Sequence, residues 1–153
     1  MKKTFFVLSY LYCLSTMISC SCYRIDTGIY PRRISISLIA DKNINNNNLL
    51  QLEIIVVKPI KASIIKKESP DRWFASNERN KLYAKHELYY HGVIGGYRAK
   101  EIISVPPDTE EIIVYADFEK KGIKDEKQQL YIPLKKWFCC YEILIRKDYI
   151  DYR

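Results

Sequence analysis

The 153-residue sequence lacks the short motifs that identify the common enzyme classes. It contains no G-x-S-x-G nucleophile turn, no phosphate-binding loop and no H-E-x-x-H metal motif. Its two histidines, His86 and His91, are five residues apart, and its cysteines do not show the paired spacings of a structural zinc site. These absences argue against a catalytic role, so we expect neither an active site nor a metal or other cofactor.

The sequence also lacks a basic helix with interleaved aromatic residues, the pattern typical of nucleic-acid binding. Lysine and arginine number 25 against 18 acidic residues. Without Lys2 and Lys3, the balance of residues 20–153 is 23 to 18, a net charge of +5. Solvated surface lysines explain this moderate excess more simply than an acidic partner does. We therefore expect no nucleic-acid partner.

No apolar run is long enough for a comfortable transmembrane helix, but the N-terminus carries a shorter one. Lys2 and Lys3 precede the uncharged, largely apolar stretch Phe5–Ile18, and the small residue Ser19 follows it. A basic start, an apolar stretch of this length and a small residue at its end are typical of a secretory signal peptide. We assign residues 1–19 to that signal.

The four residues Met17-Ile18-Ser19-Cys20 resemble the bacterial lipobox, in which the cysteine is lipidated and becomes the first mature residue. Cys22 fits the pattern less well, because Ser19 would then occupy the position of the apolar residue. The resemblance implies a lipid anchor on Cys20, and acyl chains on one cysteine hold a domain stably at a membrane. By resemblance to lipoprotein sorting in Gram-negative bacteria, Ser21 implies the periplasmic face of the outer membrane.

Three further cysteines outside the signal, Cys22, Cys139 and Cys140, leave two possibilities open. In an oxidising periplasm one disulfide can form, and a bridge from Cys22 to Cys139 or Cys140 would tie the tether to the domain. Alternatively, Cys139 and Cys140 are two buried thiols. Because they are adjacent, they would point to opposite faces of a strand.

The rest of the chain is dominated by a period-two alternation of apolar and polar residues, which predicts strands. The stretch 41–48, DKNINNNN, interrupts this pattern as a polar loop, and we expect it to join the first two strands as a hairpin with a long tip. Six or seven strands with short turns indicate one mainly β domain, a β-sandwich over residues 33–153, preceded by a tether at 20–32. The predicted strands are 33–40, 49–57, 101–105, 111–118, 130–134 and 137–145.

The middle of the chain breaks the strand pattern. Ser69-Pro70-Asp71 is a helix start, and we expect a short helix from residue 70 to about 82. Trp73 and Phe74 are its apolar anchors and are expected in the core. The order of residues 83–98 is not predicted, although the segment has room for one strand.

This layout resembles the outer-membrane lipoproteins of the type VI secretion system, the TssJ family. The resemblance is carried by the lipobox, by ISISLIADKNINNNNLLQLEIIVV (34–57) and by the proline-containing turn in ISVPPDTEEIIVYADF (103–118). It implies a transthyretin-like β-sandwich with a short helical insertion. It also implies a structural role, in which the protein is anchored to the outer membrane through Cys20 and binds a TssM-like inner-membrane partner.

In that family the loop between the first two strands contacts the partner. Carried over residue by residue, the implied binding residues here are Asp41, Lys42, Asn43, Ile44, Asn45, Asn46, Asn47 and Asn48. Without the resemblance, the same loop is simply a polar tip with no partner. The alternative function is a surface or periplasmic binding lipoprotein unrelated to secretion, such as an adhesin or an enzyme inhibitor.

Overall fold

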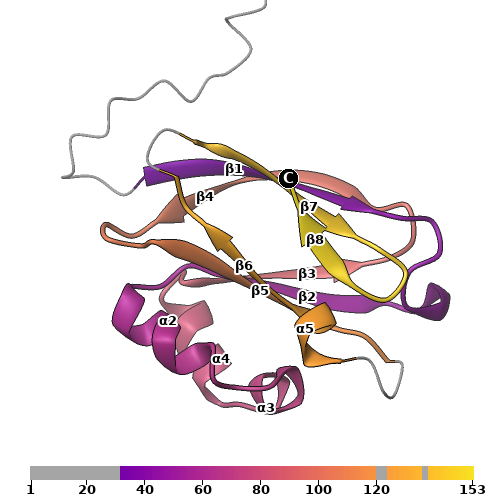
Figure 1. The fold of residues 1–153 in the computed structure, drawn as a ribbon, viewed down its shortest axis with the longest axis horizontal. Helices are drawn as coiled ribbons and strands as arrows, with labels where there is room; N and C mark the ends of the chain where they lie inside the picture. Colours follow the sequence, from indigo (N-terminus) through magenta and orange to yellow (C-terminus); the bar gives the residue numbers. More distant parts are fainter. Residues whose placement is uncertain (1–31, 120–123, 136–137) are drawn as a thin grey trace, which may run out of the picture.

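A computed structural model of the protein describes residues 32–119, 124–135 and 138–153. The predictions for the signal peptide, for Cys20 and its tether and for Cys22 concern residues outside these ranges, as does Trp137, the first residue of the predicted strand 137–145. In the described part, strands form two layers that pack face to face (Figure 1). The predicted fold class, a mainly β sandwich with a short helical insertion, is confirmed.

Each layer is a four-stranded sheet. β1 and β7 run parallel, and every other neighbouring pair is antiparallel. Sheet A has the order β4 (Arg98–Val105), β1 (Arg32–Ala40), β7 (Cys140–Ile145), β8 (Ile150–Tyr152). Sheet B has the order β3 (Leu88–Val93), β2 (Leu50–Ile55), β5 (Glu111–Asp117), β6 (Gln129–Pro133). β3 lies within the segment 83–98, whose order was not predicted, and β8 was not predicted from the sequence.

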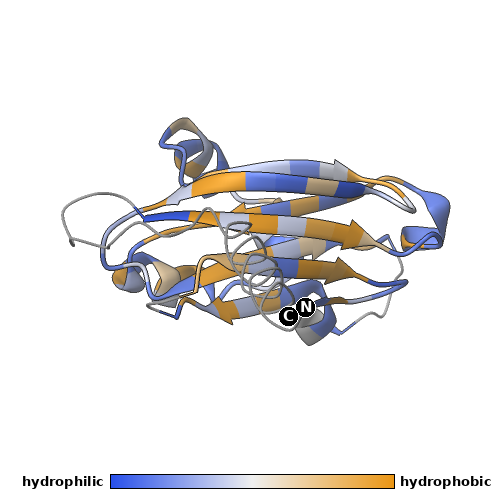
Figure 2. Cartoon of the chain, turned by 90° about the horizontal axis from the view of Figure 1, so that it is seen from above, coloured by the Kyte–Doolittle hydropathy of each residue, from blue (hydrophilic) through white to orange (hydrophobic). Residues whose placement is uncertain are grey.

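The period-two alternation determines which side chains enter the core, and Figure 2 shows apolar and polar residues alternating along the strands. In β5, Ile112 and Val114 belong to the cluster between the two sheets. Ile113 and Tyr115, on the opposite face, belong to a second cluster beneath the helices. Sheet B is therefore buried on both faces, which explains why β5 reads as a nearly continuous apolar run.

The predicted hairpin between the first two strands is wrong. β1 pairs with β4 and β7, whereas β2 pairs with β3 and β5, so the loop at 41–48 crosses from one sheet to the other. The alternation shows that each strand has one buried face, and a hairpin and a sheet-to-sheet crossing satisfy this equally well. An eight-residue loop easily spans the roughly 10 Å between packed sheets.

Short helices cover the outer face of sheet B (Figure 1). The helix start at Ser69 is as predicted, and the Ser69 hydroxyl accepts a hydrogen bond from the Arg72 backbone N–H at 3.4 Å. One continuous helix to residue 82 is wrong, because the chain turns after Phe74 and begins a second helix. The helices are α2 (Pro59–Ile65), α3 (Pro70–Phe74), α4 (Glu78–Ala84) and α5 (Asp125–Gln128). α2 and α5 were not predicted from the sequence.

Candidate partner-binding site

The loop that crosses between the sheets combines a buried anchor with an exposed rim. Ile44 is fully buried within the core between the sheets, and Asn45 is only 3% exposed. These two predicted binding residues cannot reach a partner. The other six predicted binding residues are exposed: Asp41, Lys42, Asn43, Asn46, Asn47 and Asn48.

Asn45 fixes the loop through three hydrogen bonds. Its side-chain amide donates to the Leu49 carbonyl at 3.0 Å, and its side-chain oxygen accepts from the Glu119 backbone N–H at 2.8 Å. Its own backbone N–H donates to the Lys147 carbonyl at 3.2 Å. One buried side chain therefore joins the crossing loop to the segment after β5, while its backbone joins the loop to the turn after β7.

The asparagine run also has a backbone explanation. Asn45, Asn46 and Asn47 have φ values of 44°, 53° and 65°, all in the left-handed region, and they form the short 3-10 turn η1 (Asn45–Asn47). Asparagine tolerates this conformation better than other non-glycine residues. The Asn47 N–H donates to the Ile44 carbonyl at 2.8 Å. The run therefore specifies one defined turn, and its exposed members project from a fixed backbone.

The turn between β3 and β4 packs directly against the start of this loop. The Gly96 N–H donates to the Asp41 carbonyl at 2.9 Å. A Cβ atom added at Gly95 would lie 1.9 Å from the Lys42 carbonyl oxygen, so only glycine permits this approach. The pair Gly95-Gly96, which the sequence analysis could not assign, holds the adjacent turn against the predicted binding loop.

The turn between β7 and β8 packs against the other side of the crossing loop. The Asp41 N–H donates to the Ile145 carbonyl at 2.9 Å, and the Arg146 guanidinium lies 3.1 Å from the Asp41 carboxylate. The carboxylate of Asp41 is thus engaged within the domain, although the residue is exposed.

Leu49, which is 58% exposed, and Ile94, which is 55% exposed, are large aliphatic side chains at this end of the sandwich. Leu49 follows the loop and packs over Gly92, while Ile94 begins the turn that contacts Lys42. Sequence reasoning missed Ile94, although an apolar residue beside a Gly-Gly turn is a signal that could have identified it. The loop-end surface is defined here as Lys42, Asn43, Asn46, Asn47, Leu49 and Ile94.

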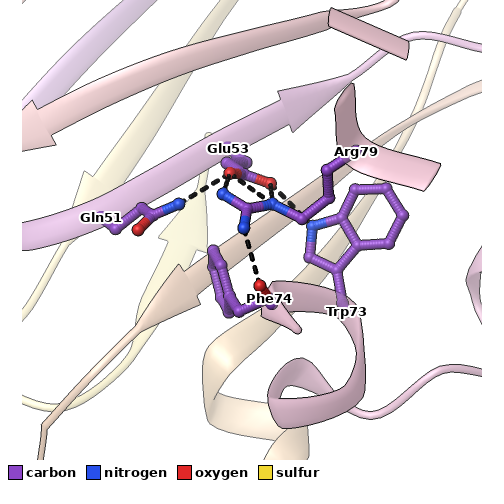
Figure 3. Close-up of polar contacts among 5 residues, drawn as sticks. All are labelled: Gln51, Glu53, Trp73, Phe74 and Arg79. Carbon is purple, nitrogen blue, oxygen red and sulfur yellow. Dashed lines mark hydrogen bonds and ion pairs between the residues drawn. The ribbon is translucent and has the colours of Figure 1, made fainter. Parts of the chain in front are cut away.

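A second cluster of polar side chains surrounds the buried carboxylate of Glu53 on β2 (Figure 3). Glu53 is 1% exposed and accepts hydrogen bonds from Trp73 Nε1 at 2.8 Å, from Gln51 Nε2 at 2.8 Å and from the Arg79 guanidinium. Arg79 also donates to the Phe74 carbonyl at 2.7 Å. Since both carboxylate oxygens are occupied by protein donors, this network fixes the helical insertion to sheet B and does not form a reaction centre.

The packing around this network bears out the sequence prediction that Trp73 is a core residue. Trp73 is 1% exposed and stacks on Tyr115 with ring centroids 5.3 Å apart. Asp117, at the end of β5, lies near the same network. Partial burial, reinforced by the carboxylate of Asp71, raises the pKa of Asp117 above its usual range.

The cysteines and histidines of the described residues do not form a metal site. Cys139 is half-buried and Cys140 is exposed, with their sulfur atoms 3.9 Å apart, so the expectation of two buried thiols is wrong. His91 is 7% exposed, and its Nε2 lies 3.1 Å from the Glu101 carboxylate. Within residues 32–119, 124–135 and 138–153, no group of three or more potential ligands is arranged to hold a metal ion. No helix in the described part of the chain combines the length and the apolar character needed to cross a bilayer.

Together, the two packed sheets, the helices on sheet B and the anchored crossing loop define a small transthyretin-like β-sandwich with one shaped end. No protein-family model and no curated protein matches the sequence. Comparison with solved structures does find the fold.

The type VI secretion lipoprotein TssJ1 from Pseudomonas aeruginosa matches with a TM-score of 0.62 and 14% sequence identity, over 80% of this chain and 95% of that one. Serratia marcescens Lip, described as a membrane-bound component of the type VI secretion system, matches with a TM-score of 0.61 and 14% identity, over 80% and 96%. A chain of a structure titled "Type VI membrane complex" matches with a TM-score of 0.61 and 10% identity, over 79% and 97%. The remote resemblance to TssJ that the sequence predicted is therefore confirmed at the level of the fold.

Proposed function

We propose that this protein is a lipid-anchored periplasmic component of a type VI secretion membrane complex, and that the loop-end surface binds its inner-membrane partner, a TssM-type protein. The fold is shared with TssJ1 and with Lip, both titled as type VI secretion components. The role is structural rather than catalytic, with the lipid on Cys20 holding the domain at the periplasmic face of the outer membrane.

The observation that carries the binding proposal is the anchoring of the crossing loop. Ile44 and Asn45 are buried, and backbone hydrogen bonds tie Asp41 to the turns after β3 and β7. A loop held in this way loses little conformational entropy when it binds, so a small contact area yields more affinity than it would from a mobile tip. Leu49 and Ile94 add apolar area to an otherwise polar rim, as is usual for interfaces that form between separately stable proteins.

Co-purification with the TssM-type protein of the same organism tests the proposal. Lys42→Glu combined with Leu49→Asp changes only exposed side chains, so the stability of the domain should change by less than about 0.5 kcal/mol for each substitution. If these side chains lie at the centre of the contact, affinity should fall by about tenfold or more.

The matched control is Ile102→Asp on β4. Ile102 is 71% exposed and lies on the outer face of sheet A, away from the crossing loop. This variant should retain the partner at the wild-type level. Full retention of the partner by the Lys42→Glu, Leu49→Asp variant would contradict the assignment of the surface. Loss of the partner in both the Lys42→Glu, Leu49→Asp variant and the Ile102→Asp variant would point to a contact spread over sheet A instead.

A further inference from the structure

α2 carries two strongly exposed aliphatic side chains. Ile60 is 81% exposed and Ile64 is 59% exposed, and their spacing of four residues places them on one face of the helix. The opposite face, with Ala62 and Ile65, is buried against sheet B. The outer apolar face therefore makes no contribution to the core.

Exposed lysines stand at both ends of this helix, Lys58 at its N-cap and Lys67 in the turn that follows it. The basal helix patch is defined here as Lys58, Ile60, Ile64 and Lys67. Apolar side chains flanked by cations are the arrangement that anionic lipid surfaces attract, because the apolar groups enter the headgroup boundary while the ammonium groups meet phosphate.

Two ion pairs hold α2 in place. Lys61 Nζ lies 2.8 Å from the Glu87 carboxylate, and Lys66 Nζ lies 2.9 Å from both carboxylate oxygens of Glu111. The lysines on the inner side of the helix are thus engaged within the domain, whereas Lys58 and Lys67 project from it. The patch is accordingly presented on a fixed helix.

α2 lies at the end of the sandwich where the described chain begins. Glu111, the partner of Lys66, begins β5 and pairs with Pro133. Arg32, the first described residue, pairs with Val105 and donates to the Lys135 carbonyl at the same end of the sandwich. Figure 1 shows α2 and the start of β1 at one end and the crossing loop at the other. The described chain thus begins at the end of the sandwich where α2 lies.

We infer that the basal helix patch docks on the anionic lipid surface to which the protein is tethered. This inference rests on the lipid anchor in the proposed function. With only two apolar side chains, the patch binds too weakly to recruit the domain by itself. A tether of about 12 residues raises the local concentration of lipid enough for a weak contact to orient the domain.

A tethered fluorescence experiment tests the docking independently of lipidation. A chain beginning at residue 20 retains every described element, and with an N-terminal histidine tag it can be held on vesicles containing a nickel-chelating lipid. The vesicles contain equal parts of phosphatidylglycerol and phosphatidylcholine with brominated acyl chains, which quench tryptophan on contact. Ile64→Trp reports on the patch, and Ile94→Trp, at a similarly exposed position on the opposite end, is the control.

Quenching of the Ile64→Trp chain well above that of the Ile94→Trp chain is the expected result. Adding Lys58→Glu and Lys67→Glu should return it to the control level, since each lysine near an anionic surface is expected to raise the docked population roughly fivefold. Vesicles of phosphatidylcholine alone should give much weaker quenching. Equal quenching of the two tryptophan variants, or quenching that survives both lysine reversals, would overturn the inference. Because the tag replaces the lipid, failure here is separate from failure of Cys20 lipidation.

Discussion

Replacing Asn45 with alanine should destabilise the domain far more than the same change one residue later. The Asn45 side chain makes hydrogen bonds of 3.0 Å and 2.8 Å to the Leu49 carbonyl and the Glu119 N–H. Both partners belong to residues at the protein surface, so water can satisfy them in part, and each lost bond should cost about 1 kcal/mol. An alanine in the left-handed conformation costs about 1 kcal/mol more. The expected loss is therefore about 3 kcal/mol.

Asn46 provides a matched comparison, because its φ of 53° is close to the 44° of Asn45 while its side chain is exposed. Asn46→Ala should cost only the backbone term, about 1 kcal/mol. Glycine removes that term, so Asn45→Gly should cost about 2 kcal/mol, and Asn46→Gly should be close to neutral.

Urea unfolding of the four variants, followed by tryptophan fluorescence, gives the free energies directly. Similar losses for Asn45→Ala and Asn46→Ala, within about 0.5 kcal/mol, would refute the argument that the buried amide anchors the loop. A large loss for Asn45→Ala that Asn45→Gly fully restores would mean that backbone conformation alone matters. Either result would weaken the case for a pre-shaped binding surface.

Three further outcomes are expected. Metabolic labelling with a palmitate analogue should mark the wild-type protein and the Cys22→Ser variant but not Cys20→Ser; loss of label only in Cys22→Ser would contradict the lipobox assignment. Trp73→Ala should destabilise the domain by about 3–5 kcal/mol, because it removes a buried ring that stacks on Tyr115 and leaves Glu53 with one hydrogen-bond donor fewer. A loss of unfolding free energy below about 0.5 kcal/mol in urea would place the ring outside the core. Burial and Asp71 raise the pKa of Asp117 in the folded state, so its contribution to stability is complete below the unfolded pKa and is lost as pH rises through the folded value. Asp117→Asn should therefore gain stability relative to wild type as pH rises from below the unfolded pKa through the folded one, and a difference in stability that does not change with pH would count against the shift.

The sequence was sufficient for the fold class because strand alternation reflects burial directly. Ile112 and Val114 alternate with Ile113 and Tyr115, and the structure buries each set in a different core. Pairing was not predictable in the same way, since an apolar face specifies a buried side and not a neighbouring strand. This is why β1 and β2 were expected in one hairpin, although the parallel pairing of β1 with β7 comes from residues about 100 positions away.

The candidate site was predictable only in its outline. The run Asn45–Asn48 reads as a polar loop from composition, but burial of Asn45 depends on hydrogen bonds to Glu119 and Lys147, which are remote in sequence. Replacing Asn45–Asn48 with a flexible linker would consequently destabilise the protein, because it removes the buried Asn45 side chain and its hydrogen bonds. Ile94 was missed because it joins the site only through packing of the Gly95-Gly96 turn against Lys42.

The direction of β1 links the two ends of the molecule. The strand begins at Arg32, where the N-terminal segment enters, and ends at Ala40, one residue before the crossing loop. The eight steps from Arg32 to Ala40, at roughly 3.3 Å each, separate the two ends by about 26 Å. A lipid anchor attached before Arg32 and a partner bound beyond Ala40 would therefore pull on opposite ends of one central strand, which is hydrogen-bonded on both sides, to β4 and to β7. A load between the two membranes would be spread over both ladders of sheet A. A structural link would benefit from this arrangement, whereas a surface domain that bears no load would not need it.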